Sequence, residues 1–152
     1  FYEALELGPG DRFLEVGTGS GYGVALAREI VGEEGKVVSI EINEVTLRFA
    51  ERNLRRLGYN DIILVRGDGS IGYRMEAPYT KVSVTADSPT VPPPLIEQLA
   101  APGRLVSPVG RNPDGSQDLI LVRKESDGTT TLDVVDKVLY VPLTGRYGWR
   151  NL

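Results

Sequence analysis

The chain of 152 residues contains no cysteine and no histidine. Without cysteine there is no disulfide and no thiolate nucleophile, and without both residue types the usual zinc ligand sets are missing. The absence of histidine also excludes a Ser-His-Asp triad and removes the commonest general base near neutral pH. Any chemistry must therefore proceed without imidazole or thiolate. We expect no metal site, and the lack of cysteine favours a cytoplasmic location.

The sequence also has no long apolar run and no excess of positive charge. No segment approaches the roughly 20 apolar residues of a transmembrane helix, and the start lacks a basic-then-apolar signal pattern. The 17 basic and 21 acidic residues give a net charge of −4, which argues against an extended nucleic-acid surface. Arg52, Arg55 and Arg56 are interpreted as a solvated helix face. We expect one domain, 1–152, that is monomeric and binds neither membrane nor nucleic acid.

Apolar strands and helical patterns alternate along the chain. Strands are expected at 12–16, 36–41, 62–65, 81–85, 104–109, 118–124 and 132–140, and helices at 22–31, 44–57 and 94–99. This order predicts a mostly parallel α/β sheet with helices on both faces. The last two strands have no helix between them, and Asp127-Gly128 favours a turn, so we expect a C-terminal antiparallel hairpin.

Helical spacing selects the residues expected to face the core. The candidates are Val24, Leu26, Ala27, Ile30 and Val31 in the first helix, and Val45, Leu47, Phe49, Ala50, Leu54 and Leu57 in the second.

A glycine-rich segment follows the first strand, where an open α/β sheet binds ligands. Gly17, Gly19 and Gly21 alternate with other residues, and Glu15 lies two positions before the first glycine. A dinucleotide-binding G-x-G-x-x-G would need a third glycine at position 22, which is Tyr22. A carboxylate near a helix N-terminus favours a cationic ligand over a pyrophosphate. The pattern resembles motif I of methyltransferases that use S-adenosylmethionine, although a structural turn is the plainer alternative.

Acidic residues follow the next two strands. Glu41 ends the second strand, where a carboxylate can accept hydrogen bonds from both ribose hydroxyls. Asp68 lies in Gly67-Asp68-Gly69-Ser70 after the third strand, where it could accept from an adenine amino group while Gly69 allows close approach. A solvated strand end and a common turn are the respective alternatives.

The segment after the fourth strand should border the acceptor. It reads Thr85-Ala86-Asp87-Ser88-Pro89, which does not match the Asp-Pro-Pro-Tyr pattern of many amino-nitrogen methyltransferases. A carboxylate acceptor has a pKa near ~4 and is already the nucleophile at pH 7. A chain without histidine can therefore methylate a carboxylate, which fits an ester-forming enzyme without selecting one.

Several segments, in order, resemble signatures of the protein-L-isoaspartate O-methyltransferase family over essentially the whole chain. They are 14–22, 67–70, 77–79, 84–86, 94–99, 108–110, 141–145 and 147–149. The resemblance implies a Rossmann-like class I methyltransferase fold with an altered order of the last strands. It also implies S-adenosyl-L-methionine as cofactor, and repair of isoaspartyl proteins or peptides by methylation of their free α-carboxylate.

The resemblance assigns roles by position. The cofactor would be held by Glu15, Gly17, Thr18, Gly19, Ser20, Gly21, Glu41, Asp68, Gly69 and Thr85. The acceptor side would be lined by Thr85, Ala86, Val109 and Leu143, within a peptide cleft shaped by 108–110 and 143–145. For any single acceptor-side residue, strand-end packing is the alternative.

Departures from the family pattern leave other functions open. A serine-bearing Thr-x-Ser-x-Pro-His segment would precede Phe1, and residues 2–7 read as a helix tail, so no catalytic residue is assigned here. Asp87 occupies a usually small, uncharged position and could repel an acceptor carboxylate by ~1 to 4 kcal/mol. Thr80 replaces a usual Asp and Ile42 a usual Arg. The alternatives are another S-adenosylmethionine-dependent methyltransferase, acting on RNA or a small molecule, and an inactive cofactor-binding fragment.

Overall fold

The computed structural model describes residues 1–150. The last two residues of the expected domain, 151 and 152, lie outside the described part. In chain order the elements are α1 (Tyr2–Leu5), β1 (Arg12–Val16), α2 (Tyr22–Val31), β2 (Lys36–Glu41), α3 (Glu44–Arg56), β3 (Ile63–Arg66), the 3₁₀ turns η1 (Gly69–Ile71) and η2 (Arg74–Glu76), β4 (Tyr79–Val84), α4 (Pro93–Glu97), β5 (Leu99–Val109), β6 (Gln117–Lys124) and β7 (Thr130–Val138).

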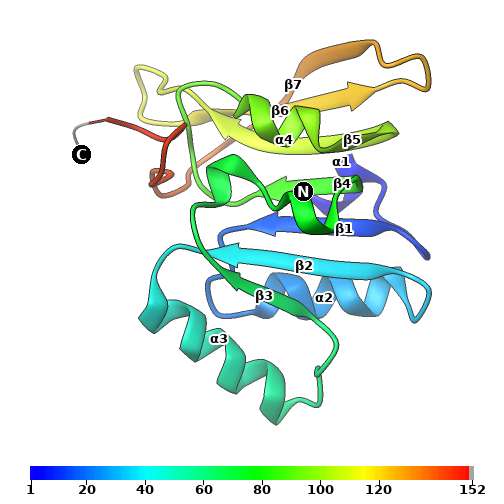
Figure 1. Ribbon diagram of the computed structural model, residues 1–152. Coiled ribbons are helices and arrows are strands. Elements are labelled where there is room, and N and C mark those ends of the chain that lie inside the picture. Colours follow the sequence, from blue (N-terminus) through cyan, green and yellow to red (C-terminus); the bar gives the residue numbers. More distant parts are fainter. Residues whose placement is uncertain (151–152) are drawn as a thin grey trace.

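All seven strands form one sheet in the order β3-β2-β1-β4-β5-β6-β7 (Figure 1). The first five strands in sequence are parallel, whereas β6 pairs antiparallel with β5 and β7 antiparallel with β6. The expected mostly parallel α/β sheet with a C-terminal antiparallel hairpin is thus confirmed. Because the order changes direction between β1 and β4, a crevice is expected at the carboxyl ends of these strands.

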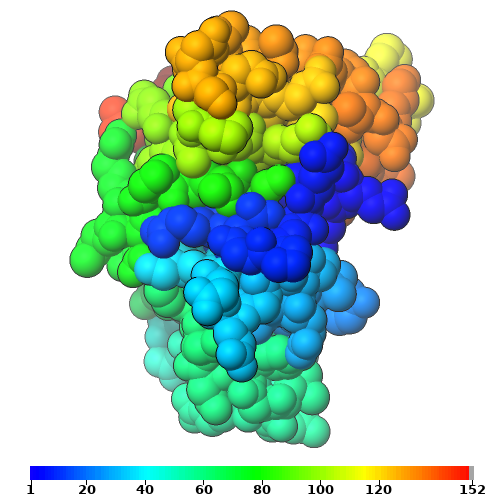
Figure 2. Space-filling model, turned by 90° about the vertical axis from the view of Figure 1, so that its right-hand side faces the viewer, coloured from blue at the N-terminus to red at the C-terminus, as the bar shows by residue number. Residues whose placement is uncertain are grey.

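Two apolar layers cover the sheet, as the alternation of side chains along β1 illustrates. Phe13 joins the layer formed with α1, α2 and α3, whereas Leu14 and Val16 join the layer that contains Leu95 of α4. Figure 2 shows the amino-terminal strand ends, with the dark blue start of the chain against the orange hairpin. There the ring of Phe1 lies 5.1 Å from that of Tyr140.

The helices bury narrower faces than their spacing predicts. Val24, Ala27 and Val31 of α2 and Leu47, Ala50 and Leu54 of α3 are buried, but Leu26 is 41% exposed and Val45 78% exposed. Phe49 and Leu57 are exposed as well. The prediction was wrong at these four positions because each helix contacts the sheet through a single stripe of residues three or four apart.

Two further differences concern the later elements. The helix expected at 94–99 ends earlier because Leu99 already pairs with Tyr79, so that β5 begins there. The edge strand β7 is exposed along almost its whole length, since no helix follows β5 or β6 within the described residues to cover it. Among residues 1–150, no helix combines the length and apolar character needed to cross a membrane.

Candidate cofactor and acceptor site

A pocket of about 330 Å³ opens at the carboxyl ends of β1, β2 and β4, where the arrowheads lie in Figure 1. This volume is within the range of small-ligand sites. The lining residues are Val16, Gly17, Gly19, Ile40, Glu41, Ile42, Thr46, Gly69, Thr85, Ala86, Val141, Pro142, Leu143 and Thr144. Seven of the residues predicted for cofactor or acceptor are among them: Gly17, Gly19, Glu41, Gly69, Thr85, Ala86 and Leu143.

The glycine loop between β1 and α2 forms one wall. Gly17, Gly19 and Gly21 have φ values of 94°, 56° and 88°, which residues with a Cβ adopt only at a cost. A Cβ on Gly17 would also collide with the hydroxyl of Thr85, whereas the space at Gly19 is open. Glycine at position 17 is therefore required both by conformation and by close packing, and the loop backbone is exposed to a ligand.

Glu41 lies beside this loop because β1 and β2 pair in parallel with Val16 opposite Ile40. Its carboxylate accepts hydrogen bonds from the N–H of Gly19 (3.2 Å) and from that of Asn43 (3.0 Å). Only 9% of Glu41 is exposed. A carboxylate has about four lone-pair sites, so the two oxygens retain capacity for further donors from a ligand.

Thr85 connects the end of β4 to the glycine loop. Its hydroxyl lies 2.9 Å from the carbonyl oxygen of Val16 and 2.8 Å from that of Gly17, and it can donate its proton to one of them. The next residue, Ala86, is buried in the pocket wall, and the following Asp87 is buried behind it. Thr85 is thus placed both as a pocket residue and as a support for the loop.

Residues 141–149, here called the C-terminal strap, close the opposite wall. The backbone of Asp87 bonds to the strap on both sides, donating to Val141 O (2.8 Å) and accepting from Leu143 N (2.7 Å). Further along the strap, the N–H of Arg146 donates to the carboxylate of Asp68 at 2.8 Å. The other oxygen of Asp68 accepts from the N–H and hydroxyl of Ser70. Both oxygens of Asp68 therefore already have protein donors.

Glu15 does not line the pocket. Its side chain is buried on the face of β1 opposite Val16, where its carboxyl group lies 3.3 Å from the hydroxyl of Tyr2 and against Gly23. Burial raises the pKa of Glu15 to about 8, against a smaller lowering by the Tyr2 hydrogen bond. The Tyr2 hydroxyl donates its proton to Gly23 O at 2.6 Å. The same hydroxyl can donate to the Glu15 carboxyl group instead, so Gly23 O and Glu15 share this one donor.

The remaining predicted residues lie outside the pocket lining. The hydroxyl of Thr18 bonds to that of Ser39 at 2.6 Å, and Val109, the last residue of β5, pairs with Ser88. Ser20 and Gly21 line a separate cavity of about 370 Å³ between α2 and α3. That cavity is slightly larger, but it lies in the helical layer and not at the strand ends. A cofactor role for these residues, and for Glu15 and Asp68, stays a prediction.

Sequence reasoning missed the apolar part of the lining. Ile40, Ile42 and Val141 contribute to the pocket, together with Pro142 and Thr144. Ile42 directly follows Glu41, and position 141 lies in the family-like segment 141–145, so proximity to predicted residues in the sequence was the available signal. Without the strand pairing, nothing distinguished pocket positions from ordinary packing.

Known proteins resemble the chain over almost its full length. Residues 1–148 match the model of the family described as "Protein-L-isoaspartate(D-aspartate) O-methyltransferase (PCMT)". A protein-L-isoaspartate O-methyltransferase of Archaeoglobus fulgidus is 47% identical over 99% of this chain and 67% of its own length. One of Pyrococcus horikoshii is 44% identical over 98% of this chain and 66% of its own length. The chain thus spans about two thirds of these relatives.

Solved structures agree. A protein-L-isoaspartate O-methyltransferase superposes with a TM-score of 0.84 and 33% identity, covering 97% of this chain and 46% of the other. A protein of Plasmodium falciparum, described as a complex with S-adenosyl-L-homocysteine, has a TM-score of 0.78 at 22% identity. The match covers 91% of this chain and 67% of the other chain, and at this identity it shows the shared fold alone. With a pocket at the expected strand ends and a family match over 148 residues, the chain belongs to the protein-L-isoaspartate O-methyltransferase family.

Proposed function

We propose that this chain binds S-adenosyl-L-methionine and takes part in methylating the free α-carboxylate of isoaspartyl residues in proteins and peptides. The observation that carries the proposal is the pocket at the ends of β1, β2 and β4, in a chain of this family. Its glycine loop and its buried carboxylate at Glu41 are contributed by consecutive strands of the sheet.

The residues of the pocket fit this cofactor. Among residues 1–150, no atom outside the neighbouring residues of Gly19 lies within 4 Å of where its Cβ would be, so the loop leaves room for a ligand. In our proposal Glu41 accepts hydrogen bonds from the ribose hydroxyls, and Gly17 and Gly19 contact the amino-acid part through their backbone. Ile42 and Gly69 would contact the adenine. When bound, the cofactor supplies a methyl group activated by a positively charged sulfur.

The acceptor would lie against Thr85, Ala86 and Leu143. Its carboxylate, with a pKa near ~4, is ionised at pH 7 and forms the new oxygen–carbon bond with its own electron pair as the carbon–sulfur bond breaks. No proton has to be removed, so the absence of histidine is no obstacle. The chain contributes position and orientation, which are a large part of catalysis in a displacement between two bound partners.

The test combines cofactor affinity with methyl transfer. Calorimetry should detect S-adenosyl-L-methionine binding, and Glu41→Ala should weaken it by about 1.5 to 3 kcal/mol because hydrogen bonds to a charged acceptor are lost. Glu44→Ala, at a half-buried position paired with exposed Arg48, is the matched control.

Radioactive methyl groups should pass to an isoaspartyl peptide and not to its normal aspartyl isomer. Cofactor binding without transfer to the isoaspartyl peptide would reject the proposed reaction, and transfer to RNA instead would favour the alternative acceptor. We further propose a monomeric, cytoplasmic protein that binds neither nucleic acid nor membrane, and light scattering on the purified chain tests the monomer.

A further inference from the structure

Three segments that are distant in sequence meet next to the acceptor end of the pocket. Asp87 directly follows the pocket residues Thr85 and Ala86. Arg111 lies in the loop after β5, which is held to the same region by a 2.9 Å hydrogen bond from Gly110 N to Ser88 O. Trp149 comes from the C-terminal strap, where its backbone N–H donates to Leu143 O at 3.2 Å.

The three side chains form one cluster. The indole N–H of Trp149 donates to a carboxylate oxygen of Asp87 at 2.7 Å. The Nε of Arg111 lies 3.9 Å from the same oxygen, and its guanidinium carbon lies 4.3 Å from the centre of the Trp149 ring. The aromatic face and the carboxylate together orient the guanidinium.

The charges in this cluster are layered. The side chain of Asp87 is 1% exposed, whereas that of Arg111 is 49% exposed. An anion that approaches from solvent therefore meets the cation first, with the carboxylate behind it. The repulsion expected from Asp87 in the sequence is offset by Arg111, because the pair has no net charge.

Most donors of Arg111 are free to bind a ligand. A guanidinium carries five N–H groups in a planar fork that matches a carboxylate. Among residues 1–150, Arg111 donates no hydrogen bond, and its ion pair with Asp87 uses only the Nε side. The other oxygen of Asp87 is buried without a donor, so the Trp149 indole is the one side-chain hydrogen-bond donor to this carboxylate among residues 1–150.

We propose that Arg111, positioned by Asp87 and Trp149, is a binding subsite for the free α-carboxylate of the acceptor. The inference rests on the proposed function and names a residue that determines its specificity. A carboxylate pairs with the guanidinium, whereas the methyl ester formed from it is neutral and loses this attraction. The subsite thus favours binding of the acid and release of the ester.

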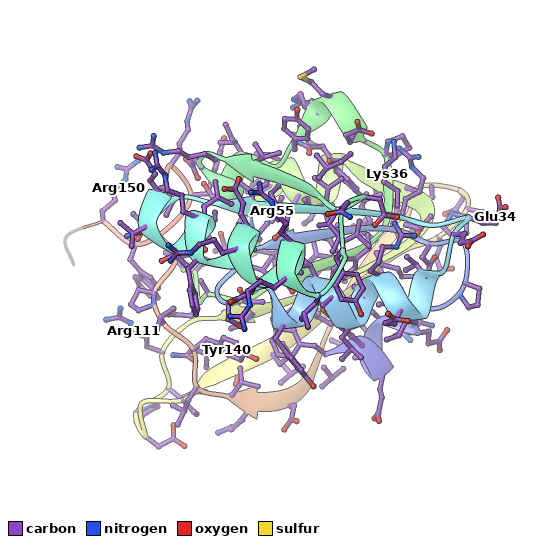
Figure 3. The ribbon with its side chains drawn as sticks, turned by 90° about the horizontal axis from the view of Figure 1, so that it is seen from below. Glu34, Lys36, Arg55, Arg111, Tyr140 and Arg150 are labelled. Carbon is purple, nitrogen blue, oxygen red and sulfur yellow. The ribbon has the colours of Figure 1, made fainter. Side chains whose placement is uncertain are left out.

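Trp149 provides a direct measurement because it is the only tryptophan. Its fluorescence would be titrated, with the chain saturated by S-adenosyl-L-homocysteine, using an isoaspartyl peptide and its α-carboxamide analogue. We expect the peptide acid to bind more tightly than the amide. Arg111→Ala should weaken binding of the acid roughly tenfold without affecting binding of the amide. The matched control is Arg150→Ala, at an exposed arginine on the same edge of the molecule (Figure 3), which should change the affinity less than about twofold.

Methyl-transfer kinetics then separate the two proposals. In Arg111→Ala the KM for the peptide should rise while kcat and cofactor affinity stay unchanged. Arg111→Lys should restore only part of the peptide affinity, because lysine lacks the planar pair of N–H donors of a guanidinium. If the chain prefers the acid over the amide, and this preference depends on Arg111, but no methyl group is transferred, the proposed function is rejected and the subsite is retained. The subsite is overturned if wild type binds acid and amide equally, if Arg111→Ala binds the acid as wild type does, or if Arg150→Ala has the same effect.

Discussion

At the scale of single residues, acids with similar sequence signals occupy different environments. Glu15 and Glu41 both lie at the carboxyl ends of strands beside the glycine loop. Glu41 accepts hydrogen bonds from two backbone N–H groups and lines the pocket, whereas Glu15 is buried away from it with a tyrosine hydroxyl as its partner. Alternation does not separate them, because Glu15 pairs with Ser39, two residues before Glu41, and both acids therefore point to the same face of the sheet. The difference is position along the strand: Glu41 is the last residue of β2, whereas Glu15 lies one residue before the end of β1.

The buried Glu15 should make stability depend on pH. Its folded pKa of about 8 lies above the ordinary value of 4.5, so the folded state holds a proton that the unfolded state releases. This contribution is fully present below pH 4.5 and is lost as pH rises through 8, with a slope of about 1.4 kcal/mol per pH unit between. Glu15→Gln, which cannot ionise, should remove that slope.

Urea unfolding of wild type and Glu15→Gln between pH 5 and 8 measures the difference, in which other titrating groups cancel. Wild type should lose stability relative to the variant as pH rises. Parallel curves would mean that Glu15 is ionised in the folded protein.

At the scale of elements, the glycine loop shows how sequence and packing act together. Gly17 has a positive φ and also contacts the Thr85 hydroxyl, so Gly17→Ala adds a collision to the backbone strain. Gly10 has a similar φ of 82° with nothing near its missing Cβ. We expect Gly10→Ala to cost ~1 to 2 kcal/mol of unfolding free energy from conformation alone.

Gly17→Ala should lower the unfolding free energy more than Gly10→Ala does. Of the two, only Gly17→Ala should weaken cofactor binding, because the loop must move away from Thr85. Chemical denaturation and calorimetry on both variants test this difference. Equal losses of stability with unchanged cofactor affinity would show that the contact with Thr85 is unimportant.

The sequence predicted the elements well where local patterns determine them. Strands β1 and β2 and helix α2 begin and end at the expected residues, since glycine or an apolar run marks each boundary. Helix α4 and strand β5 differ because the pairing of Leu99 with Tyr79 is a contact between distant segments. The exposure of Val45 and Leu57 likewise depends on how α3 meets the sheet, which helical spacing alone cannot determine.

At the scale of the whole molecule, the site depends on contacts between segments that are far apart in the sequence. Sequence reasoning placed Gly17, Glu41 and Thr85 together because parallel strands bring their carboxyl ends to one edge. It could not predict that Asp68 holds Arg146, or that Arg111 compensates Asp87, because these partners are 78 and 24 residues apart. The strap thus joins the pocket walls through contacts without a local pattern.

The bond between Asp68 and the strap can be isolated because the chain contains a similar turn elsewhere. Asp114-Gly115-Ser116 repeats the Asp-Gly-Ser sequence of residues 68–70, and Asp114 likewise accepts from the N–H (3.0 Å) and hydroxyl (2.6 Å) of its serine. Only Asp68 also accepts from the strap, at Arg146 N. In Asp68→Asn the amide NH2 must face either the N–H of Arg146 or the donors of Ser70, so one of these contacts is lost in either orientation. Asp114→Asn tests the turn alone.

We therefore expect Asp68→Asn to lower the unfolding free energy by about 1 to 3 kcal/mol more than Asp114→Asn does. It should also weaken cofactor binding, because Leu143 and Thr144 of the strap form the pocket wall. Urea denaturation measures the first effect and calorimetry the second, while hydrogen exchange should show faster opening of residues 143–149 in Asp68→Asn only. If the strap exchanges at the wild-type rate while affinity falls, Asp68 acts on the cofactor directly, as its position in the sequence first suggested.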